Sequence, residues 1–273
     1  MSSILTNNSA MTALSTLRNI NMDITSTQSR ISTGLKVGSG KDNAAYFAIS
    51  ETMKSDSGMY KSIDEGLTLT QNSVSTARLG AETIVELANS FVERVAFAQG
   101  DSVDAASVQG ELDSFVAQMQ TVIDQSSFNG ESMVDSTSAI TVVTGITRTG
   151  GTFATTTMTV TEQDLGAIQT VFAGIDLTTS ADKAADLATV EGALADAVTA
   201  ATSLGIDEKA VEVQKEFLKN LTDRLDTGIS GMIDAEVESE AAKLQALQVQ
   251  QQLATQSLSI ANQAPQNILA LFR

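Results

Sequence analysis

The chain has 273 residues and a net charge of −17, from 33 acidic and 16 basic residues. Such a charge disfavours binding to nucleic acid, which needs clustered Lys and Arg against the phosphates. The sequence contains no cysteine and no histidine, so thiolate metal sites, disulfides and the commonest general base are all excluded. We therefore expect a protein that is not an enzyme and that holds no cofactor or metal. No apolar run approaches the roughly 18 residues of a membrane span, so we expect no membrane insertion.

The charge is spread unevenly along the chain. Residues 1–100 carry 8 basic and 9 acidic groups, residues 101–205 carry 2 and 14, and residues 206–273 carry 6 and 10. The nearly balanced ends and the strongly acidic middle are typical of a protein whose middle faces solvent and whose ends face other protein. Chance drift in a solvated region is the alternative.

The first part of the chain is predicted to be helical. Leu17, Ile20, Ile24, Ile31 and Leu35 recur at helical spacing, which predicts a helix over 10–35 with one narrow apolar stripe. The glycine-containing segment 33–42 predicts a loop. Helix resumes over 43–99, a turn follows at 99–104, and a further helix is predicted over 105–126.

The loop "GLKVGSGKD" invites comparison with a phosphate-binding loop. Gly34 lies six residues before Gly40, and Asp42 stands where that motif needs Ser or Thr. Glycines that end one helix and open the next explain the segment better.

The middle of the chain changes character. Asn129-Gly130 is a strong tight-turn signal. Residues 136–180 contain 14 Thr, and β-branched runs on both sides of Gly150-Gly151 predict a hairpin. This Thr-rich stretch could also accept O-linked sugars, although Thr is common in strands for conformational reasons alone.

Helix returns from Ser180 and continues through 207–231, and a further helix is predicted over 235–263. Leu244, Leu247 and Leu258 belong to an apolar stripe of the last helix. Pro265 removes a backbone donor and disfavours the helical conformation of Ala264, so we expect a kink or a helix end there.

The stripes at the two ends are each too narrow to form a core alone, so they are expected to pair with one another. The predicted fold class is mainly α: a long antiparallel coiled coil and helical bundle formed by both chain ends, with a small β-hairpin-rich insert in the middle. Such a pair would still leave apolar surface exposed, which marks an interaction site.

Two distant motifs carry a family resemblance. "SRISTGLKVGSGKDNAAYFAIS", residues 29–50, is similar to the N-terminal signature of bacterial flagellins, and "ANQAPQNILALFR", residues 261–273, is similar to their C-terminus. "FNGESMV", residues 128–134, resembles the turn that follows the N-terminal helices of flagellins. The resemblance covers about 1–135 and 181–273.

The resemblance implies a structural subunit that polymerises into the bacterial flagellar filament for swimming motility. It implies a terminal coiled-coil domain (1–42 with 235–273) that forms the inner tube, a helical bundle domain (43–135 with 181–234) and an outward-facing insert (136–180). It also implies type III export without a cleaved signal, an extracellular location, and partners that comprise further copies of itself or other flagellins, an export chaperone, the filament cap and hook-junction proteins.

The residues expected at subunit interfaces combine the apolar stripes with the two motifs. They are Leu17, Ile20, Ile24, Arg30, Ile31, Leu35, Lys36, Lys41, Asp42, Asn43, Leu244, Leu247, Leu258, Asn262, Pro265, Gln266, Asn267, Leu269 and Arg273. For seven of them an ordinary helix pair within one chain is the alternative: Leu17, Ile20, Ile24, Ile31, Leu244, Leu247 and Leu258.

Three other functions remain open. A hook–filament junction-type flagellar protein would share the terminal helices but usually diverges in the signature at 29–50. An enzymatic insert would rely on metal-binding His-Glu motifs, and this chain has no histidine. An autonomous adhesin would need a ligand pocket, which no motif indicates.

Overall fold

A computed structural model describes residues 6–100, 103–149 and 152–271, without the side chains of Thr149 and of the residues after Gln263. Six α-helices and two antiparallel strand pairs make up this part of the chain. They are α1 (Asn8–Thr33), α2 (Ala44–Phe97), α3 (Ala105–Gln125), β1 (Ser127–Phe128), β2 (Glu131–Ser132), β3 (Ala139–Thr149), β4 (Thr152–Thr161), α4 (Leu165–Ala173), α5 (Lys183–Ile233) and α6 (Val237–Leu271).

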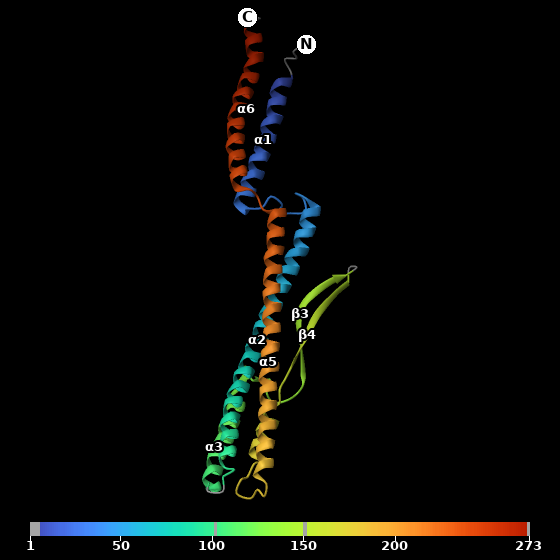
Figure 1. Cartoon of the computed structure of the whole chain (residues 1–273). Coiled ribbons are helices and arrows are strands. Elements are labelled where there is room, and N and C mark those ends of the chain that lie inside the picture. The colour runs from blue at the N-terminus through green and yellow to red at the C-terminus, as the bar shows by residue number, and fades with distance from the viewer. Residues whose placement is uncertain (1–5, 101–102, 150–151, 272–273) are drawn as a thin grey trace. The chain divides into compact units, whose positions relative to one another are not determined.

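The mainly α class with a β-hairpin in the middle is confirmed (Figure 1). The chain divides into two compact units, one of residues 1–57 with 224–273 and one of residues 58–223. We call them the terminal unit and the central unit. None of the described helices is long and apolar enough to cross a membrane.

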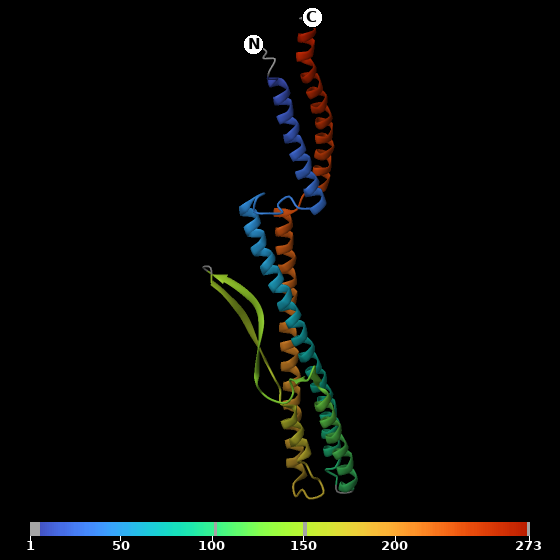
Figure 2. The same cartoon turned by 180° about the vertical axis from the view of Figure 1, so that it is seen from behind.

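In the terminal unit, α1 and α6 lie side by side in antiparallel orientation (Figures 1 and 2). Three contacts fix the register: Asn7 Nδ2 donates to Ala261 O at 2.8 Å, Gln251 Nε2 donates to Asn21 Oδ1 at 2.6 Å, and Arg30 pairs with Glu240 at 3.2 Å. The predicted pairing of the two chain ends is therefore confirmed.

The central unit contains the main apolar core, which α2, α3, α4 and α5 share with the strands. Leu67, Ile84, Leu112, Phe91 and Phe172 are all completely buried. The Phe91 and Phe172 rings meet edge to face with centroids 5.0 Å apart, a favoured aromatic geometry.

The sequence predicts two turns, and the structure describes the turn residues of the first one only. Asn129 and Gly130 both have positive φ, 54° and 83°, and join β1 to β2 as the tight turn that the sequence predicts. Strands β3 and β4 pair on either side of residues 150–151, which themselves lie outside the described part of the chain. The predicted hairpin is confirmed.

Helix α4 was not predicted, because it lies inside the Thr-rich segment 136–180. Asp164 caps it by accepting from Ala167 N at 2.8 Å, and Leu165 and Phe172 are completely buried. The helix lies against α3. Its nine residues are too few for a stable isolated helix, so packing against the core stabilises it.

Of the two outcomes predicted at Pro265, the helix end is wrong, and the kink stays a prediction. Helix α6 runs without interruption from Val237 to Leu271. A proline removes one backbone donor, and the other hydrogen bonds of a 35-residue helix remain.

Candidate assembly surface

The predicted stripe residues face inward within the terminal unit. Ile20 and Leu247 are buried in the α1–α6 pair. The remaining members are half-buried: Leu17, Ile24, Ile31, Leu244 and Leu258. The pairing inside one chain thus already occupies the apolar positions that the sequence singles out for contacts between subunits.

A second apolar stripe lies on α1, opposite to the first. Met11, Leu14 and Met22 stand at positions i, i+3 and i+11 and are exposed, Met11 to 65% and Met22 to 63%. The spacing places them on one face of the helix, about half a turn away from the buried Ile20.

Helix α6 has a matching stripe. Val249, Leu253 and Ile260 stand at i, i+4 and i+11, with Val249 56% and Ile260 66% exposed. We call the six exposed residues on the two helices the outer stripes. A protein rarely leaves so much aligned apolar side chain in water unless another surface covers it. Sequence reasoning missed these residues, although their helical spacing could have identified them.

The signature segment that follows α1 acts inside the chain. Gly34 ends α1 in the left-handed conformation, with φ 70°. Lys36 N donates to Ile233 O at 2.6 Å, and Ala235 N donates to Gly34 O at 2.8 Å, so the link from α1 to α2 pairs with the link from α5 to α6.

A small apolar cluster lies beneath this pairing. Val37, Ile229 and Ile233 are buried, and Leu35 and Phe47 pack against them half-exposed. The two links are therefore held by both backbone hydrogen bonds and side-chain burial.

Charged and polar residues of the signature also find partners within the chain. Arg30 binds Glu240 at 3.2 Å. Asp42 Oδ2 accepts from the Ser39 hydroxyl at 2.9 Å and from Ser39 N at 3.0 Å. The Ser39 hydroxyl bond lowers the pKa of the Asp42 carboxyl, and the charge of Arg30 acts in the same direction. Asn43 Oδ1 accepts from Ala45 N and Tyr46 N at the start of α2, as N-cap residues do.

The remaining predicted interface residues make no described contact of this kind. Lys36, Lys41 and Asn262 have exposed side chains. Pro265, Gln266, Asn267 and Leu269 lie on the backbone of α6, and their side chains are outside the described part of the chain, as is the whole of Arg273.

These features define a helical protein with a paired-helix terminal unit that carries exposed apolar stripes. Comparison with known proteins specifies the class. The model of the bacterial flagellin N-terminal helical region matches residues 4–139, and the model of the C-terminal helical region matches residues 187–272.

Relatives match over the whole chain. A flagellin of Brucella melitensis is 38% identical over 100% of both chains. Flagellin FljM of Caulobacter vibrioides is 34% identical over 100% of this chain and 99% of its own. Among solved structures, a putative flagellar hook-associated protein from Vibrio parahaemolyticus reaches a TM-score of 0.46 at 13% identity, covering 71% of this chain and 100% of its own, too low to compare functions.

The chain belongs to the bacterial flagellin family. It is a structural subunit of the extracellular flagellar filament that serves motility, and it is not an enzyme.

Proposed function

We propose that copies of this flagellin join through the outer stripes of α1 and α6, so that the paired terminal helices form the inner tube of the filament. The observation that carries the proposal is the second apolar face on each terminal helix, left uncovered when the first face is used within the chain. Burial of these side chains against neighbouring copies would supply the main driving force for polymerisation.

The same reasoning supports the division into domains. Residues 1–42 with 235–273 serve as the tube, 43–135 with 181–234 as the surrounding bundle, and 136–180 as the outward insert. In this division the exposed Lys36, Lys41 and Asn262 are available to neighbouring copies, whereas Arg30, Asp42 and Asn43 shape the chain that presents the stripes.

The finer partners follow from flagellin precedent. We propose export through the flagellar type III channel, escort by an export chaperone, and contact with the cap and hook-junction proteins at the filament ends. Before export, the full chain should co-precipitate with a chaperone, and deletion of residues 244–273, most of α6, should abolish this binding. Unchanged binding after the deletion would contradict escort through α6.

A matched pair of valines tests the interface. Val249 in α6 and Val213 in α5 are both 56% exposed. Val249→Asp should raise the critical concentration for elongation of filament seeds at least about a hundredfold, because a charge would be buried without a partner. Val213→Asp should leave elongation unchanged. Equal elongation by both variants, followed by light scattering and electron microscopy, would refute the proposed interface.

A further inference from the structure

Acidic residues are missing from three long stretches of the sequence. Only 1–22, 136–161 and 241–273 run for more than twenty residues without Asp or Glu. Copies of a chain with net charge −17 repel one another through their acidic surfaces, so contacts between copies favour acid-free surface. The first and third stretches supply the outer stripes. The second coincides with the β3–β4 hairpin, to which the assembly described so far gives no contact.

The base of the hairpin is anchored to its own chain. Val142 and Val160 are buried in the core of the central unit. Tyr60 Oη donates to Ile146 O at 3.2 Å, and Gln214 Nε2 donates to Thr144 O at 2.7 Å. These contacts fix the hairpin at its base and along β3.

The far part of the hairpin presents one cation and one aromatic ring. Arg148 and Phe153 are partners across the strand pair. The Arg148 guanidinium lies 5.8 Å from the centroid of the Phe153 ring, within cation–π range. Phe153 is 47% exposed.

A surface of complementary character lies elsewhere in the central unit. An open groove of about 740 Å³ runs between α2 and α5, with Val85, Val198 and Ala201 among its apolar lining. Four carboxylates also line it, those of Glu82, Glu86, Glu208 and Glu212, against two cations.

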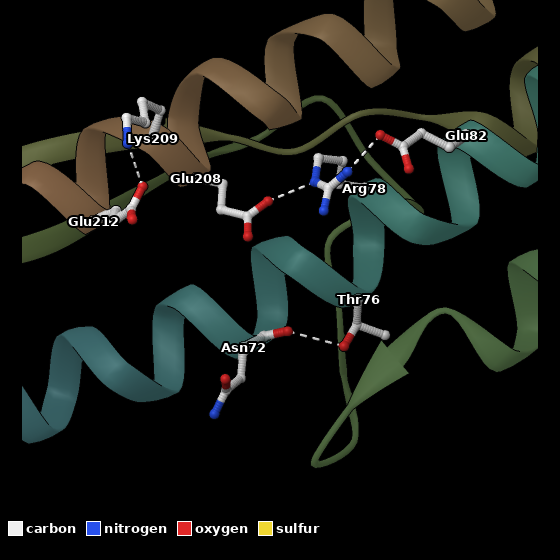
Figure 3. Close-up of polar contacts among 7 residues, drawn as sticks. All are labelled: Asn72, Thr76, Arg78, Glu82, Glu208, Lys209 and Glu212. Carbon is white, nitrogen blue, oxygen red and sulfur yellow. Dashed lines mark hydrogen bonds and ion pairs between the residues drawn. The ribbon is translucent and has the colours of Figure 1, made fainter.

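The two cations of the groove are already engaged. Figure 3 shows Arg78 between Glu208 and Glu82, and Lys209 against Glu212. The hydrogen bond that Arg78 donates to Glu208 raises the pKa of Arg78, and the bond that it donates to Glu82 adds to this effect. The groove thus keeps an excess of negative charge around an apolar lining, which suits an incoming cation beside an aromatic ring.

The hairpin and the groove lie on different sides of α5. Asp207 accepts from Thr161 N of the hairpin at 3.1 Å, whereas the next residue, Glu208, binds Arg78 in the groove. Successive residues of a helix point about 100° apart. A contact between the hairpin of one copy and the groove of another joins two different surfaces, and a repeated contact of this kind that does not close builds an open helical polymer.

We propose that Arg148 and Phe153 of one copy dock into the α2–α5 groove of a second copy. Phe153 covers the apolar lining formed by Val85, Val198 and Ala201, and Arg148 pairs with the carboxylate of Glu86. The contact adds to the terminal interface, and the proposal rests on assembly of the chain into filaments.

Cysteine cross-linking tests the contact directly, because the chain has no cysteine of its own. Thr155 follows Phe153 on the same face of β4, and Thr202 lines the groove; both are exposed. Filaments of the double variant Thr155→Cys/Thr202→Cys should give a ladder of dimers, trimers and longer products after oxidation. Each single variant should stay monomeric on the same gel.

Charge exchange provides a second, independent readout. Arg148→Glu and Glu86→Arg should each raise the critical concentration about tenfold, and the double variant should recover most of the loss. Lys219→Glu, an equal charge change at another exposed position of α5, should have little effect.

The outcomes separate this contact from the assembly itself. Filaments that form at the wild-type critical concentration with Arg148→Glu, or that give no ladder, would overturn the hairpin–groove contact and leave the terminal interface standing. Dimers from a single cysteine variant would indicate a two-fold contact and would also overturn it. Failure of the unaltered chain to elongate seeds would instead contradict the function that both proposals share.

Discussion

The two units of this flagellin bury their apolar residues to very different degrees. In the central unit, α2 alone contributes a nearly continuous series of completely buried residues, from Leu67 and Val74 to Phe91 and Val95. In the terminal unit, Ile20 and Thr27 are the only buried residues of α1, and Leu247 is the only one in the described part of α6.

A single chain buries the apolar core of the central unit completely. In the terminal unit it leaves an apolar face of α1 and of α6 exposed. Helices gain most of their stability from burial of an apolar face, and α1 and α6 each bury one narrow stripe while exposing another. The central unit should therefore set the stability of the soluble chain, and the terminal unit should gain its full stability only after other copies cover it.

The largest expected effect is in the central core. Phe91→Ala removes a completely buried ring that meets Phe172, and it should lower the free energy of unfolding by about 3–5 kcal/mol. Ile20→Ala in the terminal unit should change the main transition by less than about 0.5 kcal/mol, because the site lies outside that core. Urea denaturation followed by circular dichroism measures both. Comparable losses would show that the two units unfold as one.

A glycine tests how tightly the central helices pack. A Cβ built on Gly80 of α2 would lie 2.0 Å from Ser126 Oγ and 2.8 Å from Ser126 Cβ. Gly80→Ala should therefore cost about 1–3 kcal/mol in unfolding free energy, with partial recovery in combination with Ser126→Gly. Gly110→Ala in α3 is the matched control: no atom lies within 4 Å of its Cβ, and it should be neutral or stabilising by up to about 1 kcal/mol. A harmless Gly80→Ala would mean that α2 and α3 pack more loosely than the structure shows.

The ion pair across the terminal helices should have a smaller effect. The side chains of Arg30 and Glu240 are 33% and 14% exposed, and Arg30→Gln should weaken the α1–α6 pair by about 1 kcal/mol. Amide exchange in α1 should accelerate while exchange in the part of α2 that belongs to the central unit stays unchanged. The more exposed pair of Lys54 and Glu51 in α2 serves as the control, since Lys54→Gln should have almost no effect. Faster exchange in the core of α2 after Arg30→Gln would argue against independent units.

The smallest effect concerns the loop that joins α1 to α2. The pKa of Asp42 is lowered in the folded chain, first by the Ser39 hydroxyl. A depressed carboxyl pKa gives stability that is present above the unfolded value of about 3.9 and is lost as pH falls through the folded pKa. The protection factor of the Ser39 amide, which is the intrinsic exchange rate at each pH divided by the observed rate, should therefore fall below about pH 4, and Asp42→Asn should remove that dependence. A protection factor that does not change with pH in the unaltered chain would contradict the hydrogen bond between the Ser39 amide and the ionised Asp42.

The sequence predicts the structure correctly where the local residue pattern and the tertiary structure agree. The stripe of Ile20 and the stripe of Leu247 predicted an antiparallel pair, and Asn129-Gly130 predicted a turn whose positive φ values these residues tolerate. The hairpin followed from β-branched residues around two glycines.

Elsewhere the deciding interactions are not local. Helix α4 forms because Phe172 packs on Phe91, a contact between residues far apart in the sequence. Helix α6 continues through Pro265 although the local rule favours an end. The outer stripes were not predicted from the sequence. Helical spacing identifies the apolar faces of a helix, but it does not show which of two such faces the chain itself covers.

Oxidative footprinting of methionine tests the central claim most directly. Met11 and Met22 lie on the outer stripe of α1 and are highly exposed, whereas Met119 is buried in the central core. In the soluble chain, dilute peroxide should oxidise Met11 and Met22 quickly and Met119 slowly. In assembled filaments, Met11 and Met22 should become as protected as Met119. Equal reactivity of Met11 and Met22 in both states would show that the outer stripe stays open to solvent and would contradict its role in joining the copies.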